Sequence, residues 1–118
     1  MVPIRIYLYS NCSSCRTAES ILKDSGIAYD RRDIFREKLN AEEIQVLLGE
    51  IGKSAFDILS RRSIPYRQLD LANRSIGEAE LIELMSEYPG LLKRPIIVAG
   101  ETSQVGFNRT ALQALVAS

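Results

Sequence analysis

The 118-residue chain contains no histidine. This absence excludes the Cys–His and Ser–His pairs that many enzymes use to activate a nucleophile, and it excludes zinc sites that contain histidine. Two cysteines cannot supply four zinc ligands within one chain, although two chains could share such a site. Any chemistry therefore depends on sulfur, carboxylate, amine or backbone groups, and we predict no metal site.

The chain also lacks a long hydrophobic run and an excess of charge. No stretch approaches the roughly 18 consecutive apolar residues of a membrane helix, and the N-terminus, interrupted by Arg5, is unlike a signal peptide. The 15 basic and 15 acidic residues cancel, which argues against direct binding to nucleic acid. We therefore expect a single cytoplasmic domain, residues 1–118, that does not associate with membranes.

The N-terminal third has the pattern of a β-α-β unit. β-Branched and aromatic residues predict a strand over 4–9, a polar turn follows at 10–15, and helical periodicity continues until Gly26. A second strand is predicted within 27–35. Such an opening favours a right-handed crossover and two parallel strands.

Helices are predicted through the middle of the chain, followed by a hairpin and a last helix. Capping boxes at 40–43 and 75–78 precede apolar helical stripes, and a short helix is expected around 55–60, before Pro65. Strands at 94–98 and 104–107 flank a turn, and Asn108 can cap the final helix. The predicted fold class is α/β, a thioredoxin-like fold: a mixed four-stranded sheet with a helical insertion, 36–88, between the βαβ and ββα halves.

Cys12 and Cys15 form a C-x-x-C motif between the first predicted strand and helix. Unpaired N–H groups and the positive end of the dipole at a helix N-terminus stabilise a thiolate, and can lower a thiol pKa from about 8.5 to roughly 3.5–7.5. We therefore predict that Cys12 is the exposed nucleophile. Cys15, about one helical turn further on, would be the resolving thiol.

Other interpretations of these residues stay open. The two cysteines could be an inert buried pair, or could share a metal with a second chain, although a strand–C-x-x-C–helix pattern favours redox chemistry. Arg16 is either a ligand for an anion at Cys12 or a solvated residue of the first helical turn. Pro95 begins a predicted strand, where its peptide bond is trans in most proteins.

Three segments resemble the glutaredoxin-coupled arsenate reductase and Spx family: residues 10–16 with the strand before them, 88–98 and 104–108. The resemblance extends over essentially the whole chain. Its most specific element is the combination of Cys12, Arg16 and the Arg94-Pro95 pair. It implies a thioredoxin-like fold with a helical insertion and a cis peptide bond before Pro95.

In the enzyme branch of this family, the resemblance implies that Cys12 attacks arsenate or a similar oxyanion. Glutathione with glutaredoxin, or thioredoxin, then reduces the adduct and releases arsenite, without a bound cofactor. Arginine forks and helix N-termini suit oxyanions. Arg94 matches an arsenate-binding arginine, a second is offset by one or two positions at Arg61 and Arg62, and a third is replaced by Phe107. The predicted anion-binding residues are Ser13, Ser14, Arg16, Arg62, Arg94 and Pro95.

In the Spx branch, the resemblance implies a transcriptional regulator that binds the RNA polymerase α-subunit and senses oxidants through a Cys12–Cys15 disulfide. The second cysteine, the Arg62-Ser63 pair and segment 104–108 fit this branch well. However, Ser54 replaces a glycine that the regulator uses at its polymerase contact.

We favour the arsenate-reducing enzyme, and keep the Spx-like regulator as the alternative. A generic glutaredoxin-like disulfide reductase is a third hypothesis and ranks below the other two, because that activity would not need the long central helical region that this chain has.

Overall fold

The computed structural model describes residues 4–117, and these form two compact units. The sheet unit contains the chain up to Ile34 and from Arg94 onward, and the helical unit contains Phe35–Lys93. The helical unit thus extends five residues beyond the C-terminal limit of the predicted insertion, 36–88, since it ends at Lys93. That the chain is a single domain stays a prediction.

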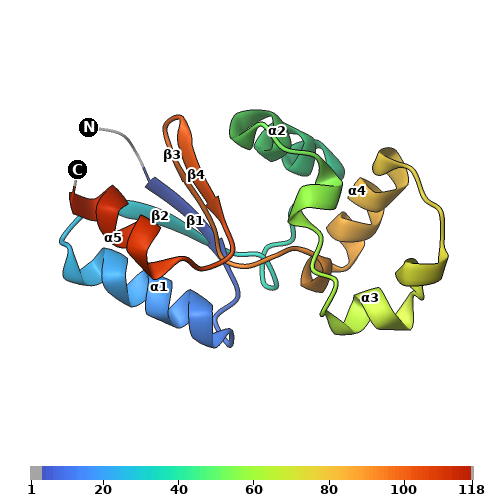
Figure 1. Ribbon diagram of the computed structural model, residues 1–118, viewed down its shortest axis with the longest axis horizontal. Helices are drawn as coiled ribbons and strands as arrows, with labels where there is room; N and C mark the ends of the chain where they lie inside the picture. The colour runs from blue at the N-terminus through green and yellow to red at the C-terminus, as the bar shows by residue number, and fades with distance from the viewer. Residues whose placement is uncertain (1–3, 118) are drawn as a thin grey trace. The chain divides into compact units, whose positions relative to one another are not determined.

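The sheet unit contains a mixed four-stranded sheet (Figure 1). Its strands are β1 (Ile4–Leu8), β2 (Tyr29–Asp33), β3 (Ile96–Ala99) and β4 (Thr102–Val105). The order across the sheet is β2-β1-β3-β4, with β1 and β2 parallel and the other two pairs antiparallel. The predicted fold class is therefore confirmed.

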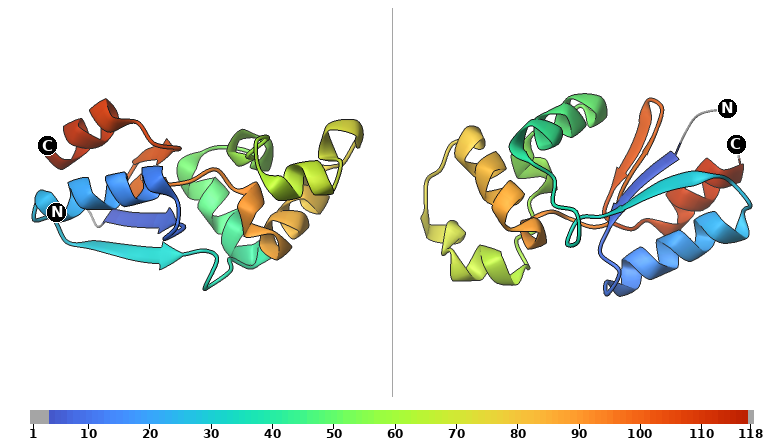
Figure 2. Two further views of the ribbon diagram at one scale, coloured as in Figure 1. Left: turned by 90° about the horizontal axis from the view of Figure 1, so that it is seen from below. Right: turned by 180° about the vertical axis from the view of Figure 1, so that it is seen from behind.

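Two helices, α1 (Ser13–Asp24) and α5 (Arg109–Ala117), cover one face of this sheet (Figures 1 and 2). Alternate residues of β1 are buried, as expected for a strand whose face packs against helices. Asn108 caps α5 as predicted, because its side-chain oxygen accepts a hydrogen bond from Ala111 N at 2.9 Å. The core consists of Ile4, Ile6, Leu8, Cys15, Ala18, Leu22, Ile97, Ala99 and Leu112.

The helical unit contains three α-helices and three short 3₁₀ helices within the described residues. They are α2 (Ala41–Ile51), η1 (Ala55–Ile58), α3 (Ile64–Gln68), η2 (Leu71–Asn73), α4 (Glu78–Glu87) and η3 (Pro89–Leu91). Apolar residues at helical spacing are buried on α2 and α4, which pack against each other. This unit has its own core, which includes Ile44, Leu47, Ile58, Leu81, Met85 and Leu91.

One predicted capping box is present and the other is not. Asn40 and Glu43 exchange side-chain and backbone hydrogen bonds at the start of α2. The predicted box at 75–78 is wrong, because α4 begins after Gly77, which has no side chain to cap it. Glu78 instead accepts a hydrogen bond from Ala55 N at 2.8 Å, so its carboxylate connects α4 to η1.

Other elements differ from the prediction as well, and two of these differences have a clear local cause. Helix α3 was not expected. It begins at Ile64 and is capped by Ser63, and Pro65 is tolerated in its first turn because a proline there loses no intrahelical hydrogen bond. Strand β4 starts at Thr102 rather than at residue 104. The reason is a tight turn in which Gly100 adopts a φ of 64°, so that Thr102 already pairs with Ala99.

Candidate active site

Cys12 lies at the junction of the sheet and α1, where it is the N-cap residue of the helix. Its backbone is extended, with φ −95° and ψ 122°, and its carbonyl accepts the first helical hydrogen bond, from Arg16 N at 3.0 Å. Its own N–H donates to Tyr9 O at 3.0 Å, which closes a turn over residues 9–12. We call these four residues the Cys12 turn. The half-buried sulfur therefore lies beside the unpaired N–H groups of α1.

The thiol of Cys12 is activated by its surroundings. Burial opposes its ionisation and is the largest single influence, but hydrogen bonds from Ser14 and from the side chain and N–H of Cys15 outweigh it. The charge of Arg94 acts in the same direction as these bonds, and together they lower the pKa of Cys12 from 9.0 to about 7. The sulfur lies 3.2 Å from Ser14 Oγ. About half of the Cys12 side chains are thus ionised at neutral pH.

Cys15 has the opposite character. It is 1% exposed, and both cysteines are free thiols. Burial, reinforced by the neighbouring Cys12, raises the pKa of Cys15 to about 12, although the Tyr9 backbone and Arg94 oppose the shift. At neutral pH Cys15 is therefore a protonated thiol hydrogen-bonded to a half-ionised one.

Arg94 is the arginine whose charge acts on Cys12. It is half-buried just before β3, and the peptide bond to the buried Pro95 is cis, as the family resemblance implied. The carbon at the centre of the guanidinium lies 5.9 Å from the ring centre of Tyr9. The Pro95 carbonyl accepts a hydrogen bond from Gly106 N at 2.8 Å, which fastens this segment to the end of β4.

Arg16 points to the Cys12 turn itself. Its Nε donates to Ser10 O at 2.9 Å, and its Nη2 lies 3.5 Å from Asn11 Oδ1. This side chain therefore stabilises the backbone conformation of the turn. Its predicted role as an anion ligand stays a prediction, as do the roles of Ser13 and Ser14.

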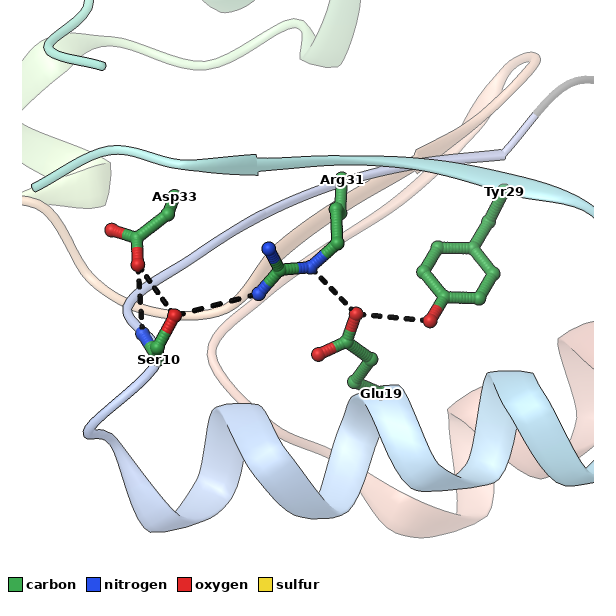
Figure 3. A network of polar contacts seen from close by, with 5 residues as sticks. All are labelled: Ser10, Glu19, Tyr29, Arg31 and Asp33. Atoms are coloured by element: carbon green, nitrogen blue, oxygen red, sulfur yellow. Dashed lines mark hydrogen bonds and ion pairs between the residues drawn. The ribbon is translucent and has the colours of Figure 1, made fainter. Parts of the chain in front are cut away.

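A chain of polar contacts joins the Cys12 turn to β2 and α1 (Figure 3). Asp33 Oδ2 accepts hydrogen bonds from Ser10 Oγ at 2.5 Å and from Ser10 N at 3.3 Å. Arg31 lies between Ser10 and Glu19, with its Nη2 3.5 Å from Ser10 Oγ and its Nε 2.7 Å from Glu19 Oε2. Tyr29 donates to the same oxygen of Glu19 at 2.9 Å; burial and this carboxylate raise the pKa of Tyr29 to about 12.

Sequence analysis missed Tyr9, Ser10 and Asp33. The signal for Asp33 was its place at the carboxyl end of a strand predicted to lie parallel to β1, where it pairs with Leu8. Phe107, at the position of an expected arginine, packs against the sheet-unit core, and the guanidinium carbon of Arg109 lies 5.6 Å from its ring centre.

Arg62 belongs to the helical unit, where it lines a hollow of about 450 Å³. Two further cations, Arg61 and Lys93, line the same hollow, together with Phe56, Asp57, Leu59 and Ser60. The predicted part of Arg62 in an anion-binding site with Cys12 stays a prediction.

Within residues 4–117, no helix has the length and apolar character needed to cross a membrane. The same residues contain no cluster of three or more Cys, Asp or Glu side chains able to hold a metal ion.

Comparison with known proteins identifies the family. The model of the ArsC family matches residues 7–115. The chain belongs to the ArsC family. It is also 34% identical over 110 residues to the global transcriptional regulator Spx of Enterococcus faecalis, a match that covers 93% of this chain and 83% of the regulator.

Solved structures of family members share the fold. An arsenate reductase (ArsC) related protein from Brucella melitensis has a TM-score of 0.71 at 30% identity, with 95% of this chain and 92% of that one covered. The arsenate reductase from Vibrio cholerae has a TM-score of 0.80 at 24% identity, with 89% and 90% covered, and shows the fold alone. The chain therefore has the thiol-oxidoreductase fold of a family whose members are named both as reductases and as regulators.

Proposed function

We propose that this protein is a thiol-dependent oxidoreductase that reduces arsenate to arsenite, with Cys12 as the nucleophile. One observation carries the proposal: two free thiols of opposite character, with pKa values of about 7 and about 12, are hydrogen-bonded at a helix N-terminus. A half-ionised thiol next to a protonated one is suited to an attack followed by an intramolecular resolution.

The reaction proceeds in two steps. The Cys12 thiolate attacks the arsenic atom, and an oxygen of arsenate leaves as water after protonation, so that a sulfur–arsenic bond forms. A second thiolate then attacks Cys12 Sγ, and the electron pair of the broken bond reduces arsenic(V) to arsenic(III), which leaves as arsenite. If Cys15 resolves the adduct, its proton is lost and a Cys12–Cys15 disulfide remains. Glutaredoxin with glutathione, or thioredoxin, returns the disulfide to two thiols.

The environment of Cys12 suits an oxyanion. The unpaired N–H groups of α1 and the positive end of its dipole favour negative charge, and Arg94 adds a guanidinium that already acts on the sulfur. Since Arg16 is bonded to the turn, we assign the principal charge-assisted contact to Arg94.

The decisive experiment measures arsenite release from arsenate by the reduced protein, with the glutaredoxin–glutathione and thioredoxin systems supplied separately. We expect turnover with one donor, loss of turnover in Cys12→Ser, and a donor-dependent defect in Cys15→Ser if Cys15 resolves the adduct. No turnover with either donor would contradict the proposal.

Arg94→Ala tests the anion contact. One lost charge-assisted hydrogen bond costs about 1.5–3 kcal/mol, which raises the KM for arsenate by about tenfold or more. Lys23→Ala, which removes a cation from the last turn of the same helix that carries Cys12 at its start, is the matched control and should leave KM unchanged. An unchanged KM in Arg94→Ala would remove Arg94 from the site.

A second candidate is a redox-sensing regulator like Spx, favoured by the 34% identity to the Enterococcus faecalis regulator over most of both chains. In this case a Cys12–Cys15 disulfide acts as a switch, and the protein binds the RNA polymerase α-subunit. A pull-down with the purified α-subunit, using reduced and oxidised protein, should then show binding that changes with oxidation. Absence of binding in both states would count against this candidate.

A further inference from the structure

Asp33 is a buried carboxylate close to the nucleophile. It is the last residue of β2, its side chain is 7% exposed, and it pairs in register with Leu8 at the end of β1. The Cys12 turn begins at Tyr9, the residue that follows β1. A buried carboxylate is costly unless hydrogen bonds compensate for lost hydration, so the partners of Asp33 indicate what it does.

Ser10, the residue after Tyr9, supplies two of those partners. Its backbone N–H and its hydroxyl both donate to Asp33 Oδ2, although 23 residues separate Ser10 from Asp33 in the sequence. The hydroxyl also accepts a long contact from Arg31 Nη2, at 3.5 Å. Asp33 therefore holds a residue of the turn through main chain and side chain together.

The remaining polar group of Ser10 is bonded from the opposite side. Arg16 Nε donates to Ser10 O at 2.9 Å, and Tyr9 O accepts from Cys12 N at 3.0 Å. The backbone between β1 and α1 is thus held by β2 on one side and by α1 on the other. The position of Cys12 Sγ relative to Ser14, Cys15 and Arg94 depends on this backbone.

We propose that Asp33 is a positioning residue for Cys12, whose carboxylate fixes Ser10 and with it the turn that carries the nucleophile. The inference rests on the proposed function in one respect, namely that Cys12 is the reactive thiol. A negative charge near a thiolate disfavours its ionisation. If Asp33 positions Cys12, its removal must make Cys12 harder to ionise, whereas a purely electrostatic effect of its charge would make Cys12 easier to ionise, so the two can be told apart.

The test is the pH dependence of Cys12 alkylation by iodoacetamide, measured in a Cys15→Ser background together with the thermal midpoint of each variant. Asp33→Ala removes both the acceptor and the charge. Asp33→Asn removes the charge but keeps an oxygen that accepts from Ser10. Asp30→Ala is the matched control, since it removes an exposed carboxylate from the same strand on the other face of the sheet.

We expect the apparent pKa of Cys12 to rise by about one unit in Asp33→Ala, so that alkylation at pH 6 slows by about tenfold. In Asp33→Asn and Asp30→Ala the rate should stay within about twofold of the parent. Ser10→Ala, at an exposed position, should slow alkylation severalfold without loss of folding, and serves if Asp33→Ala does not fold.

Three results would overturn the proposal. Asp33→Ala with a lowered thermal midpoint and an unchanged pH profile would show a purely structural role. Equal acceleration in Asp33→Ala and Asp33→Asn would show that only the charge matters. An unchanged pH profile of alkylation in Ser10→Ala would show that the hydrogen bond from the Ser10 hydroxyl to Asp33 has no effect on Cys12. Alkylation requires no arsenate, so failure of the arsenate assay leaves this test intact.

Discussion

The two units use their polar side chains differently. In the helical unit, Asn40 bonds Glu43, and Ser54 bonds Asp57, each three residues away along the chain. In the sheet unit, contacts such as Ser10–Asp33 and Glu19–Arg31 join residues 23 and 12 positions apart. The short-range contacts cap single helices, whereas the long-range contacts of Ser10, Arg31 and Asp33 join β2 to the Cys12 turn. The helical unit has a long-range contact as well, from Ala55 N to Glu78, but it joins two helices. Both cysteines, Cys12 and Cys15, lie in the sheet unit.

The largest effect that tests this comparison comes from the two cysteines. At pH 7 we expect Cys15→Ser, whose hydroxyl can keep the hydrogen bond to Cys12, to alkylate at a rate close to that of the parent. Cys12→Ser should alkylate at least about a hundredfold more slowly, because a thiol of pKa about 12 is almost wholly protonated. Both rates are measured by quenching the alkylation reaction at set times and determining the alkylated fraction by mass spectrometry. Comparable rates in the two variants would contradict the predicted difference in reactivity between Cys12 and Cys15.

A smaller effect is expected from Ser14→Ala, which removes the hydroxyl 3.2 Å from Cys12 Sγ. Since this hydrogen bond lowers the pKa of Cys12, its loss should raise that pKa by up to about one unit. The thiolate absorbance at 240 nm, followed by pH titration in the Cys15→Ser background, measures the shift. Ser13→Ala, at the exposed neighbouring position, is the control.

The two thiols should also change the stability of the reduced protein with pH in opposite directions. Because folding lowers the pKa of Cys12 from 9.0 to about 7, its contribution is present above pH 9 and is lost as pH falls through 7. Because folding raises the pKa of Cys15 to about 12, stability falls as pH rises above 9. The midpoint of urea unfolding, measured between pH 6 and 10, reports both trends. Cys12→Ser should lack the loss of stability at low pH, and Cys15→Ser should lack the loss of stability above pH 9.

The smallest effect on Cys12 is expected from the helical unit. Asn40→Ala removes the cap of α2 and should cost about 0.5–2 kcal/mol of stability, measured by urea unfolding. The pKa of Cys12 should not change, because Asn40 belongs to the other unit. A changed pH profile of alkylation would instead show that the two units are coupled.

The sequence separation between hydrogen-bonded residues also explains what sequence analysis could predict. The box at Asn40 and the cap at Asn108 were predicted, because a cap and its partner lie within one turn of helix. The parallel pairing of β1 and β2 was predicted from the β-α-β order and crossover handedness, whereas the order of all four strands comes from the structure. The bond between Asp33 and Ser10 was not, because only the parallel pairing of β1 and β2 places them together. Glu78 was misassigned for a related reason: its partner, Ala55, is 23 residues away.

The groups that stabilise the Cys12 thiolate are a hydroxyl, a neighbouring thiol, a backbone N–H and a guanidinium. Cys12 Sγ is the atom of this cluster whose charge changes near neutrality. With a pKa of about 7, a fall from pH 7.5 to 6.5 reduces the ionised fraction from about three quarters to about one quarter. The rate at which Cys12 reacts with oxidants or electrophiles should therefore fall as the medium becomes more acidic.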